Sequence, residues 1–123
     1  GNNDIGNNFT LDSLLIYRKY FGADYYGFWY NGIRCLILNS NLLKYPNNIP
    51  EISNKQDIWF EEEIEQAKLC SCQVIIFTHH PWFLNDVDEN DNNDVIPKSI
   101  REKWFKKLYQ LEDLRNKNSS IFF

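Results

Sequence analysis

The alternation of apolar and polar positions predicts an amphipathic helix near the start of this chain. Apolar residues recur at helical spacing over Leu11–Phe21, with Thr10 or Asp12 as the candidate N-terminal cap and Gly22 as the residue that ends the helix. The preceding segment, Gly1–Asn8, consists almost entirely of Gly, Asn and Asp, which is typical of a loop. We therefore expect the chain to enter its first helix close to Thr10.

Two apolar runs flank the dipeptide Asn31-Gly32, which is the strongest short-range signal for a β-hairpin. Both central positions of such a turn need positive φ angles, and Asn and Gly tolerate them. We expect Tyr25–Tyr30 and Gly32–Leu38 to pair as antiparallel strands. The following segment, Asn39–Pro50, contains two prolines and several Asn residues, so we expect a loop there.

A second amphipathic helix is expected to begin at Ser53, because a serine hydroxyl is a good N-terminal cap. Its acidic residues, Glu61–Glu63 and Glu65, are expected to face solvent. Its apolar side is expected to consist of Ile58, Trp59, Phe60, Ile64, Ala67 and Leu69.

The second half of the chain repeats the alternation of helices and strands. Val74–Phe77 is a short continuous apolar run, as is typical of a strand that is buried on both faces. A third amphipathic helix is expected at about Lys98–Leu114, and Ile121–Phe123 resembles the opening of another strand. This order predicts an α/β fold, with helices packed on a sheet, in one domain that covers residues 1–123.

Composition and charge exclude several classes of protein. The chain is 43% hydrophobic and 16% aromatic, which is too apolar for a disordered protein. Its net charge is −4 and its only basic concentration lies at Arg101–Lys107, so we expect no nucleic-acid partner. No apolar run approaches the ~20 residues of a membrane span, so we expect no membrane partner. Three cysteines, an odd number, predict free thiols in a reducing compartment rather than a disulfide framework.

Two polar clusters are candidates for chemistry. His79 and His80 are the chain's two histidines, and they follow directly after the strand expected at Val74–Phe77, where open α/β folds place their sites. The pair is a candidate functional site because of this location, or else forms a plain turn before Pro81. The second cluster, Asn2-Asn3-Asp4, offers hard oxygen ligands for divalent cations, or simply begins a loop.

Taken together, these clusters resemble two motifs of the calcineurin-like metallophosphoesterases. Gly1-Asn2-Asn3-Asp4 resembles their Gly-Asn-His-Asp/Glu motif, and Ile75–Trp82 resembles their later motif of a strand followed by His-x-Pro. The sequence between the motifs, including Tyr25–Gly32, Leu36–Ser40 and Gln56–Phe60, is similar to the branch of cytosolic serine/threonine-protein phosphatases. The resemblance covers nearly the whole chain.

The resemblance implies a role for each matching residue. Asn2 and His79 fall on metal ligands, and Asp4 falls on the acidic residue that orients the family's catalytic His. That catalytic His is replaced here by Asn3, and an amide can donate a hydrogen bond but cannot transfer a proton near neutral pH. The resemblance therefore leaves open whether the site turns over substrate.

The implied cofactors are two divalent metal ions (Mn, Fe, Zn or Mg), which activate a hydroxide and clamp the phosphate oxygens. His80 and Trp82 are expected to line the substrate cleft. The implied fold is part of a four-layer α/β/β/α sandwich. The family's Asp-x-His, Gly-Asp and Gly-His-x-His motifs do not occur in this chain, so we expect a fragment that lacks N- and C-terminal parts and is inactive alone.

The implied function is metal-dependent hydrolysis of phosphoserine or phosphothreonine in a phosphorylated protein, with a cytoplasmic location. Two alternatives remain open. One is another branch of the superfamily, a cyclic-nucleotide phosphodiesterase or a purple acid phosphatase, with a small phosphoester substrate. The other is a catalytically inactive protein that binds phosphoproteins, which the replacement at Asn3 favours.

Overall fold

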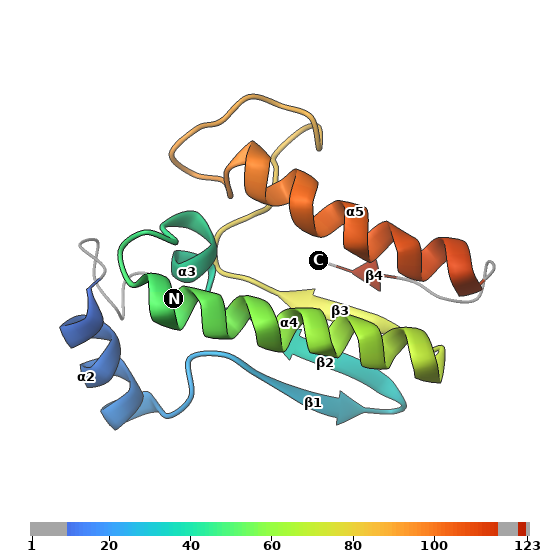
Figure 1. The fold of residues 1–123 in the computed structure, drawn as a ribbon, viewed down its shortest axis with the longest axis horizontal. Coiled ribbons are helices and arrows are strands. Elements are labelled where there is room, and N and C mark those ends of the chain that lie inside the picture. Colours follow the sequence, from blue (N-terminus) through green and yellow to red (C-terminus); the bar gives the residue numbers. More distant parts are fainter. Residues whose placement is uncertain (1–9, 116–120, 123) are drawn as a thin grey trace.

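Four strands form one mixed sheet in the order β1-β2-β3-β4 (Figure 1). The computed structural model describes residues 10–115 and 121–122. The strands are β1 (Tyr26–Tyr30), β2 (Ile33–Ile37), β3 (Val74–Phe77) and β4 (Ile121–Phe122). β1 pairs with β2 antiparallel, whereas β2 with β3 and β3 with β4 pair parallel. The prediction of an α/β fold is confirmed.

The β1–β2 hairpin has the turn that its sequence predicts. Asn31 and Gly32 have φ angles of 50° and 78°, and the strands close with Tyr30 paired to Ile33. Gly27 in β1 lies so close to the Arg34 side chain that a Cβ atom there would stand 2.5 Å from the guanidinium. The guanidinium is in turn paired with Glu63 of a helix on the same face, with a shortest distance of 2.8 Å.

The helices are α2 (Leu11–Phe21), α3 (Ser40–Lys44), α4 (Pro50–Cys70) and α5 (Lys98–Arg115). α4 and α5 contact each other, and both pack on the face of the sheet that carries Leu36 and Ile76 (Figure 1). The rings of Phe60 in α4 and Trp104 in α5 stack at 4.4 Å between their centroids. This pair lies in the main hydrophobic core, which forms because both helices turn one apolar side to the sheet.

The start of α4 differs from the sequence-based prediction. α4 begins at Pro50 rather than at a Ser53 cap, because the proline ring fixes φ in the helical range and lacks an N–H that would otherwise need a partner. Ser53 is instead buried within the first turns, where its hydroxyl donates to the Leu42 carbonyl at 3.1 Å. The expected loop also contains α3, whose N-terminus is capped by the Asn39 side chain.

The apolar side of α4 is narrower than expected. Phe60, Ile64 and Ala67 are buried, at a spacing of three to four residues. Ile58 and Leu69 were expected on that side but are 50% and 80% exposed. The expectation for these two residues was wrong, because their positions rotate away from the line that faces the sheet.

The opposite face of the sheet is only partly covered by the described residues. β3 was expected to be buried on both faces, but Phe77 is 47% exposed, which corrects that expectation. Tyr26 and Phe28, in β1, are also exposed, with ring centroids 6.3 Å apart. The helix layer therefore covers one side of the sheet, and an aromatic surface lies on the other.

The cysteines also differ from expectation. Cys70 and Cys72 form a disulfide, and Cys35 is free and buried. The prediction of three free thiols was wrong because Ser71 adopts a left-handed conformation at the end of α4 and brings the flanking Cα atoms to 5.3 Å.

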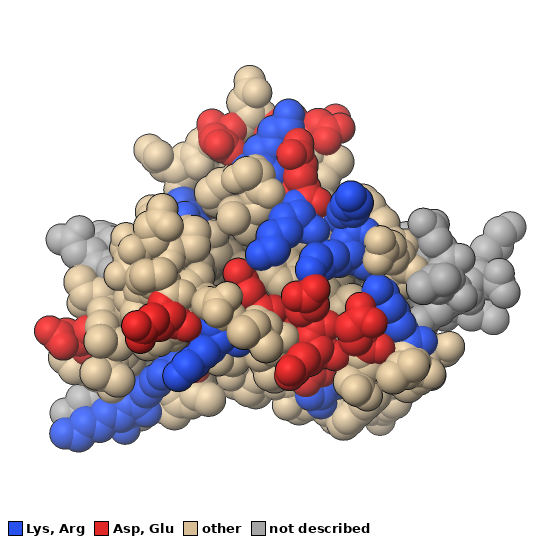
Figure 2. Space-filling view, viewed as in Figure 1, with Lys and Arg blue, Asp and Glu red and all other residues tan. Residues whose placement is uncertain are grey.

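Charges on the helix face are largely paired across α4 and α5. Figure 2 shows acidic and basic side chains side by side on this face. Lys103 pairs with Asp57 at 3.3 Å, and Lys107 pairs with Glu61. The basic concentration in α5 is therefore offset by acidic residues of α4. Within residues 10–115 and 121–122, no helix combines the length and apolar character that crossing a bilayer requires.

Candidate functional site

The C-terminal ends of β2 and β3 lie side by side, because the two strands are parallel neighbours. Ile37 pairs with Phe77, and the Leu38 N–H donates to the Phe77 carbonyl at 3.0 Å. Each strand then leads into a polar segment: β2 into 39–41 and β3 into 78–80. Sheet pairing thus brings together two polar segments that are about 40 residues apart in sequence.

His80 joins these two segments. Its Nδ1 atom lies 2.7 Å from the Ser40 hydroxyl, and its backbone N–H donates to the same oxygen at 3.1 Å. The residue is 7% exposed. Burial, followed by the nearby charge of Lys44, lowers the pKa of His80 to about 4. His80 is therefore neutral at pH 7 and ties the end of β3 to α3.

His79 has a different environment. Its side chain is exposed, and its ring meets the His80 ring edge-on with 5.1 Å between centroids. Thr78, on its other side, is fixed by donating from its hydroxyl to the His80 carbonyl at 2.9 Å. An exposed imidazole on a backbone held by its neighbours is available to bind a ligand.

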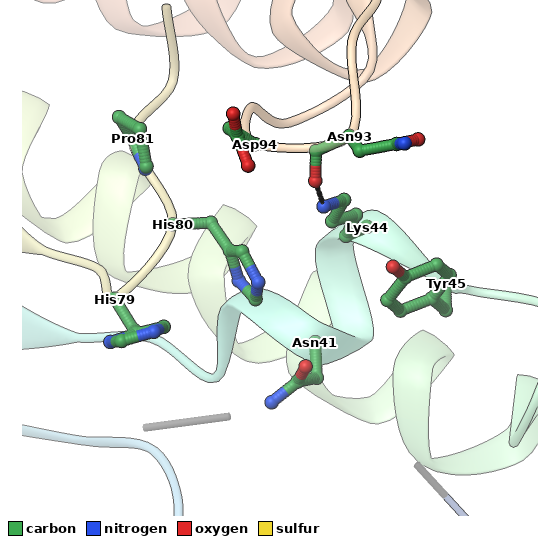
Figure 3. A pocket seen from close by; sticks show the side chains of 8 residues that line it. All are labelled: Asn41, Lys44, Tyr45, His79, His80, Pro81, Asn93 and Asp94. Carbon is green, nitrogen blue, oxygen red and sulfur yellow. Dashed lines mark hydrogen bonds between the residues drawn. The ribbon is translucent and has the colours of Figure 1, made fainter. Parts of the chain in front are cut away.

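Both histidines line a pocket of about 480 Å³ (Figure 3). The other residues that line it are Asn41, Lys44, Tyr45, Pro81, Asn93 and Asp94. Lys44, at the end of α3, donates from Nζ to the backbone carbonyl of Asn93, which joins the two sides of the pocket (Figure 3). The pocket therefore has walls from α3, from the segment after β3 and from the loop before α5.

A buried polar network holds the α3 wall in place. Gln56, fully buried in α4, accepts from the Asn39 N–H at 2.8 Å and donates to the Asn39 carbonyl at 3.1 Å. The Asn39 side chain donates to Asp24 at 3.0 Å and accepts from the Asn41 N–H at 3.0 Å. Asp24 in turn accepts from Arg18 at 2.6 Å. Each of these buried polar groups has a partner. Such a satisfied network holds the junction between β2 and α3 in one conformation.

The loop wall of the pocket is held by Arg101. This residue is fully buried in α5 and donates to the carbonyls of Val87 at 3.1 Å, Ile96 at 2.7 Å and Glu89. The Ile96 N–H donates to the Pro81 carbonyl at 3.0 Å, directly after the histidines. A single guanidinium thus organises the loop that supplies Asn93 and Asp94 to the pocket.

The predicted site residues do not all lie at this pocket. Trp82 is 3% exposed and packs on Phe105 with 5.3 Å between ring centroids. It lines a separate hollow, together with Thr78, Pro81 and Phe83. The residues Asn2, Asn3 and Asp4 lie outside the described residues.

Sequence reasoning missed the α3 side of the pocket. Ser40, Asn41 and Lys44 were assigned to a loop without a role, and Asp94 was not singled out. One signal was available: the polar triplet that begins at Asn39 follows an apolar run, as His79 and His80 do. The C-terminal ends of two parallel strands place such segments at the same edge of a sheet.

The described residues supply one candidate metal ligand rather than a complete set of ligands. Within residues 10–115 and 121–122, no group of three or more His, Cys, Asp or Glu residues is close enough to hold a metal ion. The exposed imidazole of His79 has the right chemistry for a transition-metal ligand. The remaining ligands of any metal ion here would have to come from other residues.

The chain is similar to serine/threonine-protein phosphatase CPPED1 of Homo sapiens, with 37% identity over 105 residues, which are 84% of this chain and 33% of that protein. The Mus musculus protein of the same name is 34% identical over 109 residues, or 88% of this chain and 35% of the relative. The Danio rerio protein is 35% identical over 103 residues, with shares of 83% and 33%. The chain thus spans about a third of the length of these relatives. No family model matches the chain, and no solved structure matches it significantly.

Proposed function

We propose that this chain, which belongs to the calcineurin-like phosphoesterase family, supplies part of the active site of a metal-dependent serine/threonine-protein phosphatase. The observation that carries the proposal is the position of His79. The resemblance implies that this residue is a metal ligand, and the fold presents it, exposed, at a pocket on the C-terminal edge of a parallel strand pair. The relatives are named as phosphatases of this type, and their names suggest a phosphoprotein substrate.

The chain's own residues would divide the work. His79 would bind a divalent metal ion together with Asn2, and the metal centre would supply Lewis-acid chemistry and an activated hydroxide. His80 and Ser40 would keep the His79 backbone in place through the hydrogen bonds described above. Asp4 would orient Asn3, which would donate a hydrogen bond to the phosphoryl group but supply no proton.

The exposed aromatic face of the sheet supports the remaining part of the fold proposal. In a four-layer α/β/β/α sandwich, a second sheet would pack on the face that carries Tyr26, Phe28 and Phe77. These side chains are 40–47% exposed, although aromatic rings are the side chains that gain most from burial. A contiguous apolar surface of this kind is typical of an interface.

The decisive experiment is a chimera with the human relative. This chain replaces the matching segment of human CPPED1, and hydrolysis of a phosphoserine peptide is measured with Mn²⁺ by phosphate release. We expect turnover that falls to background when His79 is replaced by Ala. A folded chimera that hydrolyses the peptide equally well with His79→Ala would contradict the proposed role of this residue.

The same chimera tests the replaced catalytic histidine. Asn3→His restores a general acid, and general acids typically contribute about 10²–10⁴-fold in rate. We expect kcat to rise by at least about 10²-fold, with a smaller change in KM. If Asn3→His is needed for any turnover at all, the protein is an inactive phosphoprotein-binding member of the family. A matched control, Asn54→His on the exposed side of α4, should leave the rate unchanged.

A further inference from the structure

We propose that Asn41 and Lys44 bind the phosphoryl oxygens of the substrate in the pocket beside His79. This inference rests on the proposed function and adds a binding role for two residues of α3. It follows from two features of the pocket: an amide without a hydrogen-bond partner among the described residues, and an ammonium group directed across the pocket.

Asn41 carries the amide. The residue is 4% exposed and lines the pocket. Its backbone groups are satisfied, since its N–H donates to the Asn39 side chain and its carbonyl accepts from the Tyr45 N–H at 2.9 Å. Within the part of the chain that the structure describes, its side-chain amide makes no hydrogen bond and is not among the polar groups that are completely shut off from solvent. An amide that lines a pocket and has no partner of its own is available to hydrogen-bond a ligand.

Figure 3 shows that this amide extends from α3 on the side of the pocket where His79 lies. Its NH₂ group offers two donors, and phosphoryl oxygens accept several hydrogen bonds. A ligand bound to His79 would therefore lie between two segments whose positions are fixed. Gln56 holds the corner before Asn41, and Ser40 ties that corner to His80.

Lys44 provides the positive charge. Its ammonium group lies 5.5 Å from the centre of the Tyr45 ring and donates to the Asn93 carbonyl, so the side chain is already directed across the pocket. An ammonium group has three donors, of which this contact uses one.

Asp94 limits the site and gives it a second test. Its carboxylate lies on the loop wall, above His80 in Figure 3, where it would repel an anion that Lys44 attracts. Lys44 and Asp94 are thus opposing charges at one pocket. Removal of the Lys44 charge should lower the affinity for an anion, and removal of the Asp94 charge should raise it. A nonspecific effect of net charge would be the same for a lysine far from the pocket.

The experiment titrates the 123-residue chain with inorganic phosphate and with O-phosphoserine, and follows ¹H–¹⁵N spectra that include the Asn41 side-chain amide. Serine is the control ligand. The variants are Lys44→Met, Asn41→Ala and Asp94→Asn, with Lys55→Met on the exposed side of α4 as the matched loss of one positive charge. Unperturbed spectra away from the pocket establish that each variant is folded.

We expect both phosphate ligands, but not serine, to shift the Asn41 amide. Lys44→Met should weaken binding about tenfold or more, since hydrogen bonds to charged groups are the strong ones, and Asn41→Ala should weaken it about threefold or more. Lys44→Arg should restore much of the affinity, and Asp94→Asn should strengthen binding severalfold. Lys55→Met should leave the affinity unchanged.

Equal losses in Lys44→Met and Lys55→Met would overturn the inference, as would phosphate binding that leaves the Asn41 amide unshifted. The outcome is separable from the proposed function. A chimera that hydrolyses phosphopeptide with kcat and KM unaffected by Lys44→Met would retain the function and refute the phosphoryl-binding role. Conversely, if a chimera binds phosphate in a way that depends on Lys44 and yet shows no turnover that depends on His79, that result would support the phosphoryl-binding role and refute the proposed function.

Discussion

Replacement of Gln56 by Leu tests whether one buried amide holds the pocket together. Gln56 is fully buried and contacts both backbone polar groups of Asn39, at 2.8 and 3.1 Å. Leucine has a similar volume but neither donor nor acceptor. The substitution therefore leaves the Asn39 N–H without its partner at the junction of β2 and α3, where Asn39 is itself 5% exposed. The Asn39 carbonyl loses one of two hydrogen bonds, because it still accepts from the Leu42 N–H at 3.1 Å.

The magnitude follows from those two groups. The N–H that loses its partner costs about 1–3 kcal/mol, and the hydrogen bond lost from the carbonyl, which keeps a second donor, costs about 0.5–1.5 kcal/mol. The added apolar contacts of leucine offset about 1–2 kcal/mol of that cost. We expect the free energy of unfolding to fall by about 1.5 kcal/mol. With a urea m-value of about 2 kcal/mol per molar, the unfolding midpoint shifts down by about 0.75 M.

The assay is urea unfolding followed by tryptophan fluorescence, with Gln66→Leu as the control. Gln66 is exposed on the same helix, so its replacement should change stability by less than about 0.5 kcal/mol. A spectral change at Ser40 and His80 should accompany Gln56→Leu, because Asn39 directly precedes α3. Equal midpoint shifts for the two glutamine variants would refute the idea that the Asn39 contacts stabilise this corner.

Two further predictions concern the loop before α5. Arg101→Met removes three hydrogen bonds to backbone carbonyls but keeps most of the apolar stem, so we expect the free energy of unfolding to fall by about 2–4 kcal/mol and the Ile96 amide to exchange faster. Lys106→Met, which changes an exposed neighbour, is the control. Equal exchange rates in the two variants would argue against the role of Arg101 in holding the loop. Glu89 accepts from the N–H groups of three residues, 84–86, which lower the pKa of its carboxyl below the usual 4.5. Because the folded-state pKa is the lower one, the ionised carboxylate stabilises the loop above pH 4.5 and this contribution is lost as the pH falls through the folded pKa. We expect the amide shifts of these three residues to titrate together below pH 4.5 in the wild type and not in Glu89→Gln; a common midpoint at or above 4.5 would refute the assignment.

Local sequence determined the existence of most elements. Asn31-Gly32 specified the hairpin because few residues tolerate the two positive φ angles of its turn. Two apolar patterns predicted β3 and α5: the continuous run Val74–Phe77 and the helical spacing that begins at Lys98. Such patterns are visible in the sequence because the spacing of apolar residues follows the geometry of the strand or helix itself. The motif around His79 likewise marked a candidate ligand, because a histidine that directly follows an apolar run can be recognised from the sequence alone.

Long-range packing determined which residues form the pocket. Pairing of β2 with β3 brings the Ser40 hydroxyl to 2.7 Å from His80 Nδ1. The sequence of neither segment indicates that it will contact the other. The burial of Arg101 depends on three carbonyls of a loop that precedes it by 5–14 residues. The sequence alone therefore predicted most of the elements and one candidate ligand. The pocket required the tertiary structure, because hydrogen bonds between distant segments depend on how the whole sheet pairs rather than on the preferences of near neighbours.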